Sequence, residues 1–324
     1  MTAVMRALVL LAIGWMAAGT EALAQGYPTK PVRMIVPFGA GGPADVFARV
    51  LAQHLTEVLK QNFVVENRPG AGAIIGTVEV AKAVPDGYTL LVMSNTHTVN
   101  ESLSPKRNYE LMRDFVPVSP INESDLMMVV NPSLGLKNLK EFIALAKSKP
   151  GQLNYASSGP GTPYHMAAEL FKAMTGTDIV HVPHKTSGDM RTSVLGGHVQ
   201  MMFDAITVLA PNVKEGKFVA LGTSGKKRSS VMPEVPTIDE AGVPGYESTI
   251  WLGVMAPAKT PQPIVDLLNA EIRKIMARPE IREAWGRQGA VPMTMTPPEF
   301  EKYLRGDIAK WAKVVSMAGL VTEK

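Results

Sequence analysis

The stretch that decides the fold is residues 32–49, VRMIVPFGAGGPADVFAR. An apolar run at 32–38 ends in the glycine-rich segment 39–42, and apolar residues then recur at helical spacing from Phe47 to Val58. This pattern predicts a buried strand, a turn and a helix. Free backbone N–H groups at the start of such a helix, together with the helix dipole, form a binding site for an anion. The sequence therefore predicts that this turn holds the acid group of a small ligand.

Length and composition set the class of protein. A chain of 324 residues is long for one domain, so two domains are expected. Apolar residues make up 46% and charged residues 19% of the chain, which allows sizeable cores and excludes wholesale disorder. The net charge of +4 is spread along the chain, so we expect no nucleic-acid partner. There is no cysteine, which excludes disulfides, a thiol nucleophile and a lipid-modified cysteine.

The N-terminal residues 1–24 are predicted to be a secretory signal peptide. Arg6 precedes an apolar run at 7–18, and Ala22-Leu23-Ala24 has the small-x-small form of a cleavage site. The run is shorter than the roughly 20 apolar residues that a membrane span needs. No later stretch is long and apolar enough to cross a bilayer. We therefore expect an exported, untethered protein cleaved near Ala24.

Strand and helix patterns alternate along the first part of the chain. Strands are expected at 62–66 and 88–93 with a helix at 74–83 between them, which is typical of a parallel sheet covered by helices on both faces. Ligands of such sheets bind beyond the carboxyl ends of the strands. The loop after Phe38 and the polar segment 94–98, expected to be a loop after the third strand, should therefore share one edge.

The strand, glycine turn and helix recur in a second domain, which the chain enters through an apolar strand at 126–130. The repeat has a strand at 153–156, a turn at 157–163 and a helix at 164–175. A strand at 251–255 is expected to return to the first domain. Two crossings between domains indicate a hinge with a cleft. Further strands are expected at 179–183, 199–203 and 218–223, and helices at 139–147, 264–276 and 298–318.

Asp45 has two interpretations. A carboxylate in the first turn of a helix complements the dipole and accepts from free N–H groups. Alternatively, Asp45 lies at the cleft and orders the turn or a water around the ligand. Direct contact with a ligand carboxylate would be repulsive, so its partner there would be an uncharged atom or a water.

Cofactor and metal chemistry are not expected. Residues 39–44 fit the dinucleotide pattern G-x-G-x-x-A, but Pro43 lies inside the motif and an exported chain rarely meets NAD. The six histidines lack metal-ligand spacing. His97, His165 and His184 lie at expected cleft loops, where an imidazole could hydrogen-bond an acid.

An exported serine hydrolase is the alternative from another functional class. No G-x-S-x-G motif is present, but Ser157 or Ser158 could act with a histidine. A third possibility is a sensory protein that docks on a membrane kinase when it holds its ligand. Turnover, or covalent trapping by a serine-directed reagent, would favour the hydrolase.

The motifs together resemble the Bug family, the extracytoplasmic solute receptors of tripartite tricarboxylate transporters. The resemblance covers essentially the whole mature chain. It rests on the segments YPTKPVRMIVPF at 27–38, GGPAD at 41–45, ENRPGAG at 66–72, PDGYTL at 85–90, YASSGPGT at 155–162, HVP at 181–183 and GGHVQ at 196–200.

The resemblance implies a periplasmic binding protein fold of type II, with two α/β lobes, a hinge and an interlobe cleft. Residues 25–125 and 248–324 would form lobe 1, and 126–247 lobe 2. It implies a monomer that binds a small carboxylic acid between its glycine turns and delivers it to membrane transporter subunits. The implied binding residues are Phe38, Gly39, Gly42, Asp45, Ser94, Asn95, His97, Thr98, Ser157, Ser158, Gly159, Thr162, His165, His184 and Asp204.

One loop departs from the family pattern. After residues 181–183 the family often has Tyr-Lys-Gly, whereas this chain has His184-Lys185-Thr186. The loop helps to select the far end of the ligand. His97 and His184, if both face the cleft, would suit a second carboxylate, for example that of a phthalate-type diacid.

Overall fold

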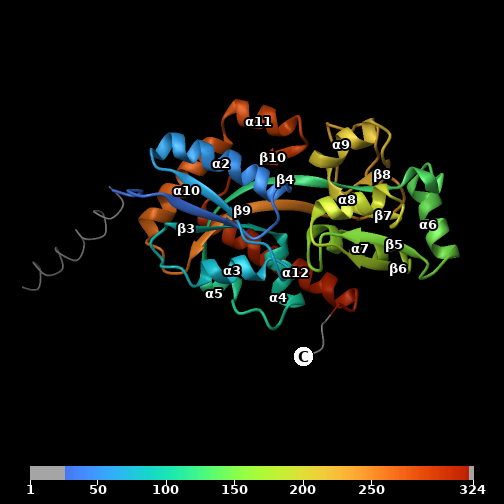
Figure 1. Ribbon diagram of the computed structural model, residues 1–324, viewed down its shortest axis with the longest axis horizontal. Coiled ribbons are helices and arrows are strands. Elements are labelled where there is room, and N and C mark those ends of the chain that lie inside the picture. The colour runs from blue at the N-terminus through green and yellow to red at the C-terminus, as the bar shows by residue number, and fades with distance from the viewer. Residues whose placement is uncertain (1–25, 321–324) are drawn as a thin grey trace, which may run out of the picture.

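A computed structural model describes residues 26–320. The predicted signal peptide therefore lies outside the described residues. Two groups of strands and helices lie side by side along the longest axis, and the long strands β4 (Phe115–Val130) and β9 (Thr249–Pro257) run in the middle (Figure 1). We call residues 126–247 the second half and the rest of the described chain the first half. This division follows the sequence expectation, and its boundaries stay a prediction.

The first half is built on three parallel strands. β1 (Val32–Val36) lies between β2 (Phe63–Asn67) and β3 (Thr89–Ser94) and is parallel to both. β9 then pairs with β3 in the antiparallel direction. The parallel arrangement of the first three strands and the returning strand were both predicted, and the antiparallel direction of β9 was not. The strand order of the whole sheet is β2-β1-β3-β9-β4-β7-β5-β6.

Strand β4 connects the two halves. Its residues 115–125 pair with β9, and its residues 126–130 pair with β7 (Met201–Ala205) and β8 (Val219–Thr223). The sequence predicted only the second part as a strand. Pro117 and Pro120 interrupt the apolar pattern of the first part, and the register with β9 shifts beside both of them.

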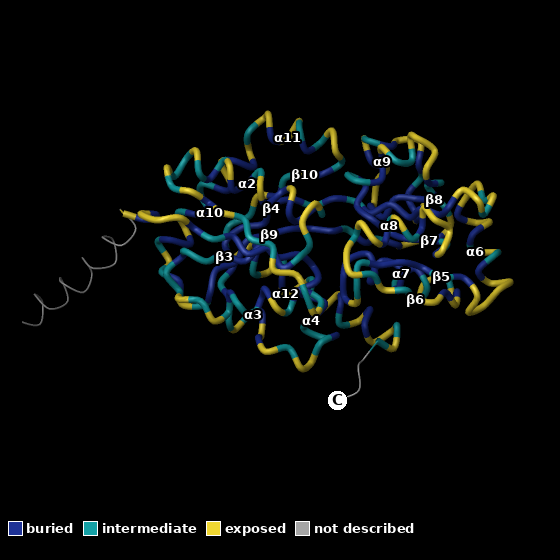
Figure 2. The backbone as a smooth tube through the Cα atoms, viewed as in Figure 1, coloured by how far each residue is buried: buried dark blue, intermediate teal, exposed yellow. Residues whose placement is uncertain are grey.

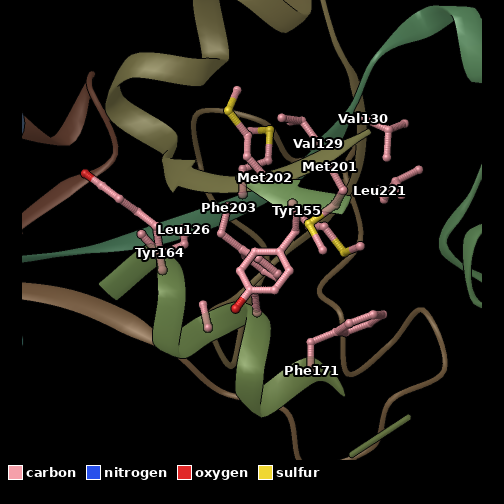
Figure 3. Close-up of a cluster of buried hydrophobic side chains, with 14 of the residues drawn as sticks. Leu126, Val129, Val130, Tyr155, Tyr164, Phe171, Met201, Met202, Phe203 and Leu221 are labelled. Carbon is pink, nitrogen blue, oxygen red and sulfur yellow. The ribbon is translucent and has the colours of Figure 1, made fainter. Parts of the chain in front are cut away.

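The second half repeats the parallel arrangement. β5 (Leu153–Ser157) lies between β6 (Ile179–Pro183) and β7, parallel to both, and α7 (Pro163–Thr175) packs against β5 and β7. Aromatic and aliphatic side chains from these strands and from α7, including Tyr155, Phe171 and Phe203, form one buried cluster (Figure 3). Figure 2 shows buried strands at the centre of both halves and exposed residues at their outer loops.

The remaining elements cover the sheet or connect its strands. Strand β10 (Ala290–Pro292) adds an antiparallel pairing to β4. The others are α2 (Pro43–Leu59), α3 (Ile74–Ala81), α4 (Asn95–Leu103), α5 (Leu111–Asp114), the 3₁₀ turn Pro132–Leu134, α6 (Leu139–Ser148), α8 (Ser187–Leu195), α9 (Ile206–Lys214), α10 (Gln262–Met276), α11 (Pro279–Gly286) and α12 (Pro297–Met317).

The last helix contacts both halves. Trp311 of α12 shares a buried cluster with Val99 of α4, from the first half, and with Met166 of α7, from the second. The other buried clusters stay within one half each, apart from Ile250 at the crossing. Within residues 26–320 no helix has both the length and the apolar character needed to cross a bilayer.

Candidate functional site

A cavity of about 780 Å³ lies between the two halves. Four loop segments line it, and each follows the carboxyl end of a parallel strand: residues 37–44 after β1, 69–73 after β2, 158–164 after β5 and 184–188 after β6. Parallel strands present their ligand sites at this end. Two of the segments come from each half, so a ligand in the cavity would contact both.

The first glycine turn, residues 39–42, is built around Asp45. Gly41 adopts a left-handed φ of 75°, and its N–H donates to Asp45 Oδ2 at 2.9 Å. Burial opposes ionisation of Asp45, but hydrogen bonds from Arg49 and from the Gly41 N–H outweigh it and lower the carboxyl pKa. Asp45 therefore remains a charged acceptor behind the turn, which agrees with a role in ordering the turn.

Helix α2 leaves this turn without a side-chain cap. Its N-cap residue is Gly42, and Pro43, which has no N–H, fills the first helical position. The N–H groups of the residues that follow in the first helical turn have no carbonyl acceptor within the helix. Gly42, Pro43 and Ala44 all line the cavity.

The second glycine turn, residues 158–161, has the same construction around His165. Gly161 also has a φ of 75°, and its N–H donates to His165 Nδ1 at 3.1 Å. Burial lowers the pKa of His165 to about 4, so the imidazole is neutral and can accept this bond at neutral pH. Helix α7 begins as α2 does, with Pro163 at its first position and an N-cap residue, Thr162, whose side chain does not cap the helix.

Two helix N-termini without side-chain caps thus meet the same cavity from opposite halves. Each offers backbone N–H donors and the positive end of a helix dipole. A single carboxylate between them could accept hydrogen bonds from both halves. This is the arrangement that the family resemblance implies, and ligand contact stays a prediction.

A third turn, residues 69–73, also lines the cavity, and the sequence analysis did not place it there. The sequence predicted the strand before this turn and the helix after it, and the position of the turn at the carboxyl end of a parallel strand was the signal that could have placed it at the cavity. The two halves lie close together at the rim. A β-carbon added to Gly72 would lie 3.5 Å from Pro160 O, and one added to Gly39 would lie 3.7 Å from Thr186 Cγ2.

The charges at the cavity wall favour an anion. Lys185 and Arg191 line the wall, and no aspartate or glutamate does so among the described residues. Arg191 donates from Nη1 to Asp204 Oδ2 at 2.8 Å. Burial raises the pKa of Asp204, and the Arg191 guanidinium opposes that shift. The sequence analysis missed Arg191, because α8 was not predicted and its residues gave no periodic signal.

The structure divides the predicted site residues into two sets. The first set lines the cavity: Phe38, Gly39, Gly42, Ser94, Ser158, Gly159, Thr162 and His184. The second set does not reach the cavity wall: Asp45, Asn95, His97, Thr98, Ser157, His165 and Asp204.

The expectation of a loop at residues 94–98 was wrong. Ser94 is the N-cap of α4, and its hydroxyl accepts from the Thr96 N–H. Asn95 and Thr98 belong to the helix and bond within the first half, to Thr249 O and to Asp307 Oδ2. Acceptors distant in sequence thus bind the Asn95 and Thr98 side chains, so this polar segment can form a buried helix.

His97 does not face the cleft. It is fully buried in α4, its Nε2 lies 3.0 Å from Thr77 Oγ1, and its Nδ1 accepts from the Ser94 N–H. Burial lowers its pKa to about 4. Of the two histidines on which the hypothesis of an aromatic diacid rested, only His184 lines the cavity.

A close pair of serine and histidine side chains lies behind the second glycine turn. Ser157 is fully buried, and its Oγ lies 2.6 Å from His181 Nε2. The same Oγ accepts from the Gly159 N–H at 3.1 Å, so it supports the turn. Burial lowers the pKa of His181 to about 3. Among residues 26–320 no cluster of three or more potential metal ligands occurs.

Comparisons with known proteins agree with this geometry. The family model described as "Tripartite tricarboxylate transporter family receptor" matches residues 47–320. Protein BugT of Bordetella pertussis (strain Tohama I) is 39% identical over 298 residues, which is 91% of each chain. The structure of Rpa4515 from R. palustris with adipate is 34% identical, covers 90% of this chain and 98% of that one, and has a TM-score of 0.87. MatC (Rpa3494) from Rhodopseudomonas palustris with bound malate is 32% identical, covers 89% and 100%, and has a TM-score of 0.84.

These matches confirm three expectations. The fold is the α/β periplasmic binding protein fold. Relatives of this kind are solute-binding receptors, so the protein is not an enzyme, and the serine hydrolase is set aside. The chain belongs to the Bug family, the periplasmic solute-binding receptors of the tripartite tricarboxylate transporter type.

Proposed function

We propose that this receptor captures a small mono- or dicarboxylic acid and delivers it to a tripartite tricarboxylate-type membrane transporter. The observation that carries the proposal is the pair of helix N-termini, α2 and α7, which lack side-chain caps and meet one cavity. The cations at its wall and the lack of lining acids in the described chain support an anionic ligand. The structures of Rpa4515 with adipate and of MatC with bound malate support the carboxylate class.

The ligand would act by joining the two halves. One carboxylate would accept N–H bonds from residues 39–44 and residues 158–164, which belong to different halves. Such a ligand binds the closed arrangement better than an open one and shifts the population toward it. Closure would present one surface to the transporter, and release would leave the acid unchanged.

A thermal-shift and unfolding screen of the exported protein against carboxylic acids tests the ligand class. At about 100 times its dissociation constant, a ligand adds roughly 2.7 kcal/mol to the free energy of unfolding. The corresponding amides, which keep the shape and lose the charge, serve as matched controls. Equal stabilisation by acid and amide, or none by any acid, would contradict the proposal. Ligand-dependent cross-linking to the transporter's membrane subunits tests delivery separately.

A further inference from the structure

We infer that Arg191, held in place by Asp204, forms a second anion subsite that binds the distal carboxylate of an α,ω-dicarboxylic acid. This inference rests on the proposed function, because it assumes that the first carboxylate binds between the glycine turns. It adds a guanidinium donor from α8 to a cavity whose two glycine turns offer backbone N–H groups.

The Arg191–Asp204 pair is asymmetric in its exposure. The Arg191 side chain is 21% exposed and lines the cavity, whereas the Asp204 side chain is 0% exposed. Asp204 also accepts from the Ala205 N–H at 2.8 Å. The carboxylate is therefore fixed in the protein, and it holds one edge of a guanidinium that remains accessible from the cavity.

Arg191 keeps donors for a ligand. A guanidinium has five N–H groups in a planar fork that matches a carboxylate. Among the described residues, Arg191 donates a hydrogen bond to Asp204, and it does so through Nη1. A guanidinium oriented by a buried counter-ion is preorganised. A ligand carboxylate would therefore bind with little further loss of conformational entropy in the Arg191 side chain.

The cavity and its charges suit a dianion. A volume of about 780 Å³ is well above what one carboxylate needs, and lies in the range of small-molecule sites. The glycine turns can serve one acid group from the N-termini of α2 and α7. Arg191, assisted by Lys185, gives the cavity a second centre of positive charge on the loop and helix that follow β6.

Matched acids separate this subsite from general acid binding. The pairs are succinate with butyrate, glutarate with pentanoate, and adipate with hexanoate, each titrated by calorimetry. For the best-bound diacid, Arg191→Gln should weaken binding by about tenfold to a hundredfold, the usual effect of a lost charged hydrogen bond. The matched monoacid should change by less than about twofold.

Two further variants control for folding and for charge. The double variant Arg191→Gln/Asp204→Asn removes both charges, so that no carboxylate is left unpaired, and should show the same diacid-selective loss. Arg287→Gln makes the same charge change at an exposed position directly after α11 that does not line the cavity, and should leave both affinities unchanged.

The outcomes distinguish this inference from the proposed function. Equal losses for monoacid and diacid in Arg191→Gln, or unchanged diacid affinity, would overturn the subsite while acid binding stands. A wild-type protein that binds monoacids better than their diacids would overturn it too. A wild-type protein that binds no carboxylic acid would overturn the proposed function and the subsite together.

Discussion

The two glycine turns share a backbone design and differ in the side chain behind it. In both, a glycine with a φ of 75° donates its N–H to a side chain four residues later, in the first turn of a helix that starts with proline. The acceptor is the charged Asp45 in the first turn and the neutral His165 in the second. The geometry therefore depends on an acceptor at that position and not on its charge.

The surroundings explain the choice of acceptor. Asp45 has an ion pair with Arg49, whose side chain is 53% exposed, so its charge is compensated at the surface. His165 is buried and its ring lies against the rings of the buried Tyr155 and the half-buried His181. An ion there would lose its hydration, whereas a neutral imidazole can accept the Gly161 N–H at lower cost.

The largest expected effect comes from filling the cavity at the two N-cap positions. Gly42→Leu and Thr162→Leu each place a bulky side chain where the carboxylate would bind, and each should weaken acid binding by more than about a hundredfold. Gly42 has a φ of −83°, and a β-carbon there would meet no atom closer than 3.6 Å, so Gly42→Leu should fold normally. Calorimetry and circular dichroism measure both.

Thr162→Leu should also lose stability, by about 1 kcal/mol, because the Thr162 hydroxyl donates to Gly159 O at 2.7 Å. Acid binding that survives in only one of the two variants would contradict the inference that both turns bind the same carboxylate. It would show that the corresponding turn does not hold the ligand.

The next effect is on the pH dependence of folding. The folded pKa of His165, about 4, lies below its unfolded value of about 6.5, so the unfolded state takes up the proton first as the pH falls. The neutral His165 therefore contributes fully to the free energy of unfolding above pH 6.5. This contribution is lost as the pH falls toward 4, a change on the order of 3 kcal/mol. The stability difference between wild type and His165→Gln should follow that loss in urea unfolding from pH 7 to 4.

Asp45 should behave differently, because its pKa is lowered from an ordinary value of 3.8. The difference between wild type and Asp45→Asn should be constant from pH 7 to about 5 and shrink only near pH 4 and below. Parallel pH profiles for the two variants would contradict the assignment of a neutral and a charged acceptor.

The smallest effect distinguishes the two left-handed glycines. Gly41→Ala should cost only the backbone strain of a left-handed residue, about 1–2 kcal/mol, because an added β-carbon meets nothing within 4 Å. Gly161→Ala should cost at least about 1 kcal/mol more, since its β-carbon would lie 3.0 Å from Leu103 Cδ2 in α4. Urea unfolding of both variants measures the difference. Equal losses would mean that α4 adjusts freely.

Much of the site could be predicted from sequence because its elements are local. A strand, a glycine turn and a helix starting with proline are all specified within about twenty neighbouring residues, and both glycine turns were located. The bounds of the predicted strands other than β4 agreed to within two residues, for example at β2 and β3. The resemblance added the pairing of the two turns across the cleft, which no local pattern contains.

The missed features depend on contacts distant in sequence. Residues 95–103 are polar and were expected to begin as a loop, yet they form a buried helix because Thr249, Asp307 and Thr77 supply their partners. The first part of β4 is stabilised by its pairing with β9 in spite of its prolines. Arg191 became a candidate only when folding brought its cavity-lining side chain to Asp204.

The main-chain character of the two glycine turns has a consequence for how ligand preference evolves. Every residue except proline carries the same N–H, so point mutations at these turns cannot change the chemistry of those donors, only block or distort them. Selection for a new nutrient must then act on replaceable side chains such as His184, Lys185 and Arg191. A library randomised at these positions should yield altered acid preferences, whereas one randomised at residues 39–42 should yield mostly inactive clones.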